Sequence, residues 1–226
     1  MVNHLKIYVL NDNEPEKGLK NDWGWSAYIE SEKWTIIFDA DTTPDIIEHN
    51  AAKLNLNLKK LNFAFLSHYH HDHYGGFEYV GKIINNLKVF TPEDSDMLKK
   101  WNLEPVYLDS SKKIEEDVFS TGPLAKGKLK EHAMIINVDN YGSIVIVGCS
   151  HPGIANIVDK ALEISAPVHM VIGGFHYPPQ SQLDDIAAKV RYICPAHCSG
   201  NNAKNYVKSH YSEKFCVVKT GSIIEL

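Results

Sequence analysis

A short run of metal-binding side chains is the feature that most constrains this sequence. Four potential ligands, His68, His70, Asp72 and His73, occupy six positions between an apolar segment at 61–66 and a pair of glycines. The apolar segment predicts a strand, and side chains two positions apart leave a strand on the same face, so His68 and His70 should point the same way. Asp72 and His73 come where the chain turns, and they can face a second position close by.

The residue types in this run indicate a metal site. Imidazole nitrogens together with one carboxylate suit zinc and its neighbours among the divalent transition ions. Two half-sites in one run are typical of a metal pair that acts on a single substrate. The alternative is a solvated histidine tract that binds metal adventitiously, but the fixed spacing after an apolar strand favours a built site. We therefore expect up to two zinc ions, with manganese or iron as substitutes.

Two further histidines are the best candidates to complete the site. Each metal needs about three protein ligands and one open position. His151 and His197 each follow an apolar strand pattern, at 144–147 and 192–194, and sites in α/β sheets form at such strand ends. We expect two sets of ligands, each with two residues of the run and one from a strand end: His68, His70 and His151 for the first ion, and Asp72, His73 and His197 for the second.

The other histidines carry less information. His176 also follows an apolar strand and a glycine pair, and three roles stay open for it: a metal ligand, an acid that faces the substrate, or a partner of a ligand. We interpret His132, at the start of a hairpin, as a surface residue. Six aromatic residues are candidates for the wall of a substrate pocket: Trp23, Trp25, Tyr69, Tyr74, Phe175 and Tyr177.

The spacing His68-x-His70-x-Asp72-His73 resembles the signature of the metallo-β-lactamase superfamily. The segments 26–30 and 35–39 look like the opening hairpin of that superfamily. Three later segments are similar to one branch of it, often labelled 7,8-dihydropterin-6-methyl-4-(β-D-ribofuranosyl)-aminobenzene-5'-phosphate synthase-like proteins: 147–153, 172–176 and 195–200. The resemblance implies an α/β fold, a four-layer αβ/βα sandwich, formed by one domain over 1–226 with the metals at one edge of the sheets.

The sequence departs from the superfamily at one position of the site. Many members have a Gly-Asp pair whose aspartate bridges the two metals, and the comparable strand end here reads Gly148-Cys149. We interpret Cys149 as a small buried residue, and the alternative is a thiolate close to the metals, which would favour zinc. Cys194 and Cys198 flank His197, and we interpret them as buried thiols in preference to a separate structural zinc site.

The remaining sequence predicts layered α/β packing, because strand patterns mix with helical ones. Strands are expected at 5–10, 25–30, 34–39, 88–90, 133–138, 143–147, 168–172, 191–195 and 215–219, with short strands within 106–122. Helices are expected at 44–55, 77–85, 94–101, 154–164, 182–190 and 202–209. Thr43 followed by Pro44 predicts the start of the first helix, with a capping hydroxyl before a proline at the first helical position.

Composition narrows the classes of function. The 226 residues are 44% hydrophobic, enough for a sizeable core, and the net charge of −5 argues against a nucleic-acid or membrane-surface binder. No apolar run approaches the ~20 residues of a membrane span, and no signal peptide is visible. Four cysteines do not form a dense disulfide framework. We expect a cytoplasmic protein with a small-molecule substrate, and the sequence does not predict its oligomeric state. We interpret the basic stretch 126–130 as a solvated loop, with phosphate binding as the alternative.

The expected chemistry is hydrolysis of a phosphoester or carboxylic ester. Metal ions supply a nucleophile from water and offset the charge that develops in the transition state. Asp72 is placed to hold one metal and to pass a proton to the leaving group, and His176 could stabilise the developing oxyanion. Two alternatives remain, a di-iron oxidoreductase and a degenerate protein that binds metal or ligand without turnover. Against the first, the chain keeps His70, where oxidoreductase members usually carry a carboxylate, and has no room for a flavin domain.

Overall fold

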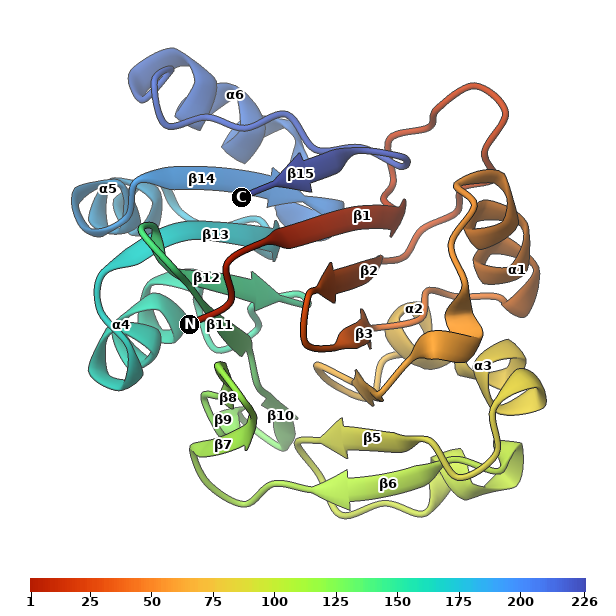
Figure 1. The fold of residues 1–226 in the computed structure, drawn as a ribbon. Coiled ribbons are helices and arrows are strands. Elements are labelled where there is room, and N and C mark those ends of the chain that lie inside the picture. Colours follow the sequence, from red (N-terminus) through yellow and green to blue (C-terminus); the bar gives the residue numbers. More distant parts are fainter.

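Two β-sheets packed face to face form the centre of the molecule, and helices cover the outer face of each (Figure 1). The computed structural model describes residues 1–226. The first sheet has seven strands in the order β15-β1-β2-β3-β4-β5-β6, and the second has six in the order β14-β13-β12-β11-β8-β7. This arrangement confirms the predicted four-layer α/β sandwich.

The strands of the first sheet are β1 (Leu5–Asn11), β2 (Ser26–Ser31), β3 (Thr35–Phe38), β4 (Phe63–Phe65), β5 (Lys88–Thr91), β6 (Glu104–Tyr107) and β15 (Ile223–Glu225). Those of the second are β7 (Lys112–Glu115), β8 (Val118–Ser120), β11 (Met134–Val138), β12 (Gly142–Val147), β13 (Val168–Gly174) and β14 (Tyr192–Ala196). A separate hairpin pairs β9 (Leu124–Lys126) with β10 (Leu129–Glu131). The α-helices are α1 (Pro44–Lys53), α2 (His71–Tyr74), α3 (Phe77–Ile83), α4 (Ile154–Ile164), α5 (Gln180–Lys189) and α6 (Gly200–His210).

Strand β12 explains why the sandwich has four layers. Its apolar run has no polar side, because both faces of the strand are buried. Ile144 and Ile146 enter the core between the two sheets, whereas Val145 and Val147 enter the core under α4 and α5. The first sheet repeats the pattern, with Phe38 in the core between the sheets and Ile37 in the core under α1 and α3.

Most predicted elements are confirmed, with ends that differ by a few residues. Helix α1 begins with Pro44 as predicted, although the Thr43 side chain makes no capping hydrogen bond. The helix predicted at 94–101 is wrong, because Met97–Trp101 forms a 3₁₀ helix. None of the helices is long and apolar enough to cross a bilayer.

The strand predicted at 215–219 is also wrong. Phe215 makes only an isolated bridge to Ile193 in β14. The chain then leaves the second sheet and turns at Gly221, which has a φ of +81° and donates its N–H to Val9 O at 2.8 Å. Strand β15 follows and pairs antiparallel with β1, so the last strand belongs to the first sheet (Figure 1).

Candidate metal centre

The candidate residues gather at one edge of the two sheets, where strands end. The run 68–73 follows β4, and His151, His176 and His197 follow β12, β13 and β14. Strands β12, β13 and β14 are parallel neighbours, so their carboxyl ends lie side by side. Strand β4 is parallel to β3 in the facing sheet, and it brings the run to the same edge.

Glycine at position 148 allows the two sheets to touch at this edge. A Cβ atom there would lie 2.0 Å from Ser67 Oγ and 3.2 Å from Asp39 Oδ2. Any other residue would therefore push the end of β12 away from the ends of β3 and β4. The contact carries the loop 149–151 of one sheet onto the histidine run of the other.

The three imidazoles of the first predicted set, His68, His70 and His151, lie close together. His68 Nε2 lies 3.1 Å from His70 Nδ1, and His151 Nε2 lies 3.2 Å from the same His70 atom. His68 is fully buried and its other nitrogen, Nδ1, contacts Ser67 Oγ at 2.9 Å. Burial lowers the pKa of His68 well below its usual value, so this imidazole is neutral, as a metal ligand must be.

The second predicted set surrounds the carboxylate of Asp72. Asp72 Oδ2 lies 3.4 Å from His197 Nε2 and 3.7 Å from His73 Nε2. The buried Nε2 of His197 has no hydrogen-bond partner, and an unsatisfied buried polar atom is costly. A cation between these three groups would satisfy it, so the donor set fits a metal. Burial opposes ionisation of Asp72, but the contact with His197 and the charge of His73 together lower its pKa below the usual range.

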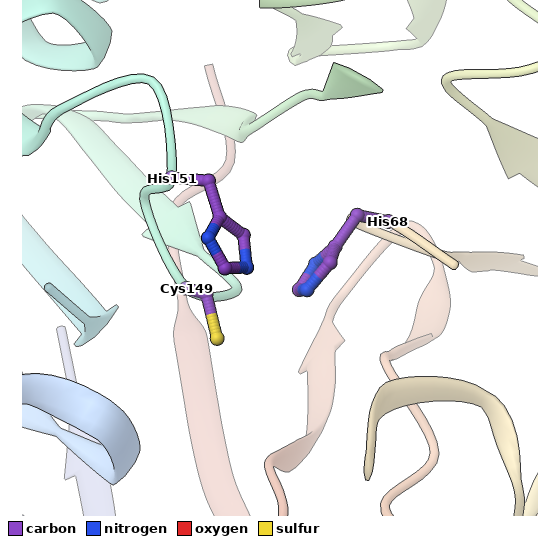
Figure 2. Close-up of side chains that lie close together, drawn as sticks. All are labelled: His68, Cys149 and His151. Carbon is purple, nitrogen blue, oxygen red and sulfur yellow. The ribbon is translucent and has the colours of Figure 1, made fainter. Parts of the chain in front are cut away.

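Cys149 lies between the two sets. It is buried, as interpreted from the sequence, and its Sγ is 3.2 Å from His73 Nε2. The ligand atoms of His68, Cys149 and His151 all lie within 4.8 Å of one another, and so do those of His73, Cys149 and His197. Figure 2 shows the sulfur beneath the His151 ring, facing the gap across which His68 approaches.

Two buried carboxylates that the sequence analysis missed hold the candidate ligands in place. Asp39 Oδ2 contacts His73 Nδ1 and Ser67 Oγ, both at 2.7 Å, and its Oδ1 accepts the Ser67 N–H at 2.7 Å. When Asp39 is ionised it accepts the N–H of His73 Nδ1, which leaves Nε2 with its lone pair toward the site, although burial raises the pKa of Asp39. As the first polar residue after a predicted strand in the facing sheet, Asp39 could have been found from the sequence.

Glu131 likewise holds the loop 149–151 of the second sheet in place. Its Oε1 accepts the N–H groups of Cys149 and Ser150 at 2.8 and 2.7 Å, and its Oε2 accepts that of His151 at 2.7 Å. These three bonds fix the loop that carries both a thiol and an imidazole into the site. No local pattern marks Glu131, because its partners lie 18 to 20 residues further along the chain.

Comparison with known proteins decides the family. The model of the metallo-beta-lactamase superfamily matches residues 24–197, most of the chain. The chain belongs to the metallo-beta-lactamase superfamily. It is 29% identical to the 7,8-dihydropterin-6-methyl-4-(beta-D-ribofuranosyl)-aminobenzene-5'-phosphate synthase of Methanocaldococcus jannaschii, over 289 aligned positions that include 99% of this chain and 97% of the relative. Because 289 positions exceed the 226 residues of this chain, the relative carries inserted segments.

Solved structures support the same fold. The crystal structure of Tm1679, described as a metal-dependent hydrolase of the beta-lactamase superfamily, superposes with a TM-score of 0.80 at 22% identity, covering 98% of this chain and 99% of that one. A diphosphatase of the PhnP family superposes with a TM-score of 0.68 at 12% identity, covering 100% and 98%. The chain therefore has the fold of the metallo-beta-lactamase superfamily, and its buried groups of histidine and cysteine could hold a metal.

His176 lies at the rim of the site. It is exposed, its ring centroid is 4.2 Å from that of His151, and its ligand atoms lie within 4.8 Å of the sulfurs of Cys149 and Cys198. It belongs to neither of the two predicted sets. Its backbone, like that of Tyr177, has a φ of +49°, a conformation that costs free energy in residues other than glycine and that often occurs at functional sites.

Aromatic side chains define a cavity beside His197. Its volume is about 350 Å³, and its lining includes Trp23, Tyr177 and Lys204. Trp23 donates its indole N–H to Asp72 Oδ2 at 3.0 Å, which links the cavity wall to the second set. Two of the predicted wall residues are wrong, since Trp25 and Phe175 are buried in the interior.

The surface assignment of His132 is wrong. The residue is fully buried, with Nε2 2.8 Å from Leu66 O and Nδ1 2.9 Å from Ser120 Oγ, and its ring stacks on Phe65 at 4.0 Å. The hairpin that precedes it turns inward to deliver Glu131 to the site, and His132 follows into the space between the sheets. Burial lowers the pKa of His132 to about 3, so it stays neutral in the folded protein.

This burial predicts a pH-dependent loss of stability. Below pH 6.5 the unfolded chain binds a proton at His132, whereas the folded chain does not, so the free energy of unfolding falls as the pH drops. The test variant is His132→Gln, which retains an N–H donor for Leu66 O. When the pH falls from 7 to 5, we expect the unfolding free energy of the wild type to drop by about 2 kcal/mol more than that of His132→Gln. Urea unfolding at a series of pH values measures this difference.

The control is His4→Gln, at an exposed position, which should keep the pH dependence of the wild type. Parallel stability curves for the wild type and His132→Gln would contradict the burial of a neutral imidazole at position 132.

Proposed function

We propose that this protein hydrolyses phosphoesters with the help of up to two zinc ions, with carboxylic esters as the second substrate class and manganese or iron as substitute metals. The observation that carries the proposal is the convergence of imidazole nitrogens at 3.1 and 3.2 Å in one set, together with the unpartnered buried Nε2 of His197 in the other.

We assign the ligands in two sets: His68, His70 and His151 for one ion, and Asp72, His73 and His197 for the other. Each set offers three ligands, which leaves an open position of the kind that catalytic zinc sites keep. When bound, the metals would activate water and polarise the scissile bond.

The residues around the site would position groups and move a proton. The indole N–H of Trp23 holds the Asp72 carboxylate in place. Asp72 would accept a proton from the attacking water and return it to the leaving oxygen. His176, exposed beside His151, would donate a hydrogen bond to the oxygen on which charge develops.

A lysine near the site favours phosphoesters over carboxylic esters. Lys126 ends β9 in the hairpin whose other strand ends at Glu131, and Glu131 is bonded to the His151 backbone. Burial, the neighbouring histidines and, as the smallest contribution, the positive charge of Lys126 lower the pKa of His151 to about 3. Lys126 is exposed at the end of this hairpin. The names of the aminobenzene-5'-phosphate synthase and of the diphosphatase also point to phosphate compounds.

The proposal predicts chelator-sensitive turnover. We expect tag-free protein loaded with zinc, manganese, iron or cobalt to hydrolyse at least one chromogenic phosphomonoester, phosphodiester or carboxylic ester, with weak or no action on β-lactams. Asp72→Ala should lower kcat/KM by about 100-fold or more, with little change in the melting temperature, because the side chain is only partly buried. No turnover with any metal across the panel would favour a protein that binds metal without catalysis.

The lysine predicts a difference between substrate classes. Lys126→Ala should lower kcat/KM for the best phosphoester by about tenfold or more, since it removes a positive charge facing developing negative charge, and should leave a carboxylic ester almost unaffected. Lys128→Ala is the matched control, an exposed lysine of the same hairpin turn. Equal losses on both ester classes would contradict a phosphate contact.

The ligand sets predict how many ions each variant retains. We expect His151→Ala to empty mainly the first position and His197→Ala mainly the second, each leaving about one ion per chain by elemental analysis. Their metal affinities should fall by more than the 10–100-fold typical of residues that only support a ligand. His176→Ala should instead lower turnover and keep the metal content; loss of metal in that variant would contradict the assignment.

A further inference from the structure

We propose that a second cavity, next to the one beside His197, binds a distal anionic group of the substrate through Lys208. This inference rests on the proposed function, because it requires a substrate in the first cavity. It adds a substrate class, elongated esters with an apolar middle and a negatively charged far end. The second cavity has a volume of about 280 Å³, and it is lined mainly by α6 and the segment 215–219.

The two cavities form one continuous groove. Glu14, Asn201 and Lys204 line both of them. The groove therefore runs from the candidate metal centre at His197 to Lys208, and its walls are shared along the way. A substrate whose reacting bond lies at the metal centre can extend along these walls into the second cavity.

Helix α6 supplies one wall of the groove. Asn201, Lys204 and Lys208 share one face of the helix because their spacing is three and four residues, whereas Ala203 and Val207 lie on another face and are buried. Lys208 is one turn beyond Lys204, a distance of about 6 Å along the helix axis. A ligand that fills the first cavity thus needs only a short extension to reach the ammonium group of Lys208.

The segment 215–219 supplies the opposite wall, which is apolar. Phe215 still bridges to Ile193 in β14, but the chain then leaves the second sheet and runs to β15 (Figure 1). Phe215 and Val217 line the second cavity, and Val217 is 72% exposed. An apolar wall with a few charged groups is typical of a small-molecule site, so the middle of the groove suits an alkyl or aromatic part of a ligand.

The charges of the second cavity favour an anion. The whole chain has a net charge of −5, yet three lysines and a single glutamate line this cavity. Lys204 pairs with Glu14 at 3.4 Å, and Lys219 pairs with Glu16. Lys208 is exposed and forms no ion pair. Its ammonium group is therefore free to bind an anionic group of a ligand.

Calorimetric titration with phenylhexyl sulfonate tests the groove. This probe combines an aromatic ring, an apolar chain and a permanent negative charge, and sulfonates bind zinc only weakly. At low salt, we expect the tag-free protein as purified to bind it about fivefold or more tightly than the neutral phenylhexanol. Lys208→Ala should remove this difference and Lys208→Glu should reverse it. Added salt should reduce the difference in the wild type, because the pair is exposed.

Tyr177→Ala tests whether one molecule spans both cavities. Tyr177 is 64% exposed and lines the first cavity only. This variant should weaken the binding of phenylhexyl sulfonate, whose ring reaches the first cavity, more than the binding of hexyl sulfonate, which has no ring. Equal losses for the two sulfonates would contradict a ligand that extends along the groove.

Lys82→Ala is the matched control for Lys208→Ala. Both lysines are exposed and lie in the last turn of a helix, so the two variants lose the same charge in the same setting, but α3 covers the other sheet. Lys82→Ala should bind the sulfonate like the wild type. Failure of the wild type to bind the sulfonate, equal binding of sulfonate and alcohol by the wild type, or an equal loss in both lysine variants would overturn the proposal.

Inhibition of turnover links the groove to the substrate. Phenylhexyl sulfonate should raise KM for the best ester and leave kcat unchanged, because it occupies the place of the substrate. Inhibition that lowers kcat alone would overturn a role of the groove in substrate binding. Absence of turnover with every ester and metal would contradict the proposed function, whereas the calorimetric titrations do not depend on turnover.

Discussion

The site depends on one close contact between the two sheets. At Gly148 the end of β12 lies so near Ser67 and Asp39 that no side chain fits. Through this contact, ligands that are far apart in sequence and come from opposite sheets reach one edge of the sandwich. A side chain at position 148 would push the two sheets apart and so separate His151 and Cys149 from the histidine run.

Buried carboxylates turn this proximity into a fixed geometry. Asp39 sets the tautomer of His73 from the first sheet, and Glu131 holds three consecutive amides of the facing loop. The backbone is strained at the same edge, since Asp39, Ser150 and His197 all have positive φ values. A positive φ in a residue other than glycine lowers the stability of the fold and persists only where the surrounding structure fixes it. The placement of the candidate ligands therefore lowers the stability of the fold.

Local sequence predicted the parts of this arrangement that local rules govern. The spacing from His68 to His73 predicted two ligand pairs, and the apolar patterns before His151 and His197 predicted that both would lie at strand ends. The apolar pattern at 143–147 likewise predicted the strand that the structure shows as β12. These patterns account for the layered α/β packing and for the two sets of residues that the structure brings together, whereas the four-layer arrangement followed from the resemblance to the superfamily.

Long-range packing accounts for what the sequence did not predict. Glu131 acts on amides 18 to 20 residues away, and His132 is buried only because the hairpin before it turns toward the site. The segment after Phe215 has strand-forming residues, but the chain crosses to the other sheet there. Whether Cys149 packs as a small residue or faces the metals depends on the distance between two sheets, which no pattern within one strand encodes.

The central claim is that two ions divide the ligands between them at this edge. A crystal structure of zinc-loaded protein, with anomalous diffraction recorded at the zinc absorption edge, tests it most directly. We expect two anomalous peaks, each about 2.0–2.2 Å from its nitrogen and oxygen ligands, one among His68, His70 and His151 and the other among Asp72, His73 and His197. A peak coordinated by His176, with His151 or His197 turned away from the metal, would contradict it.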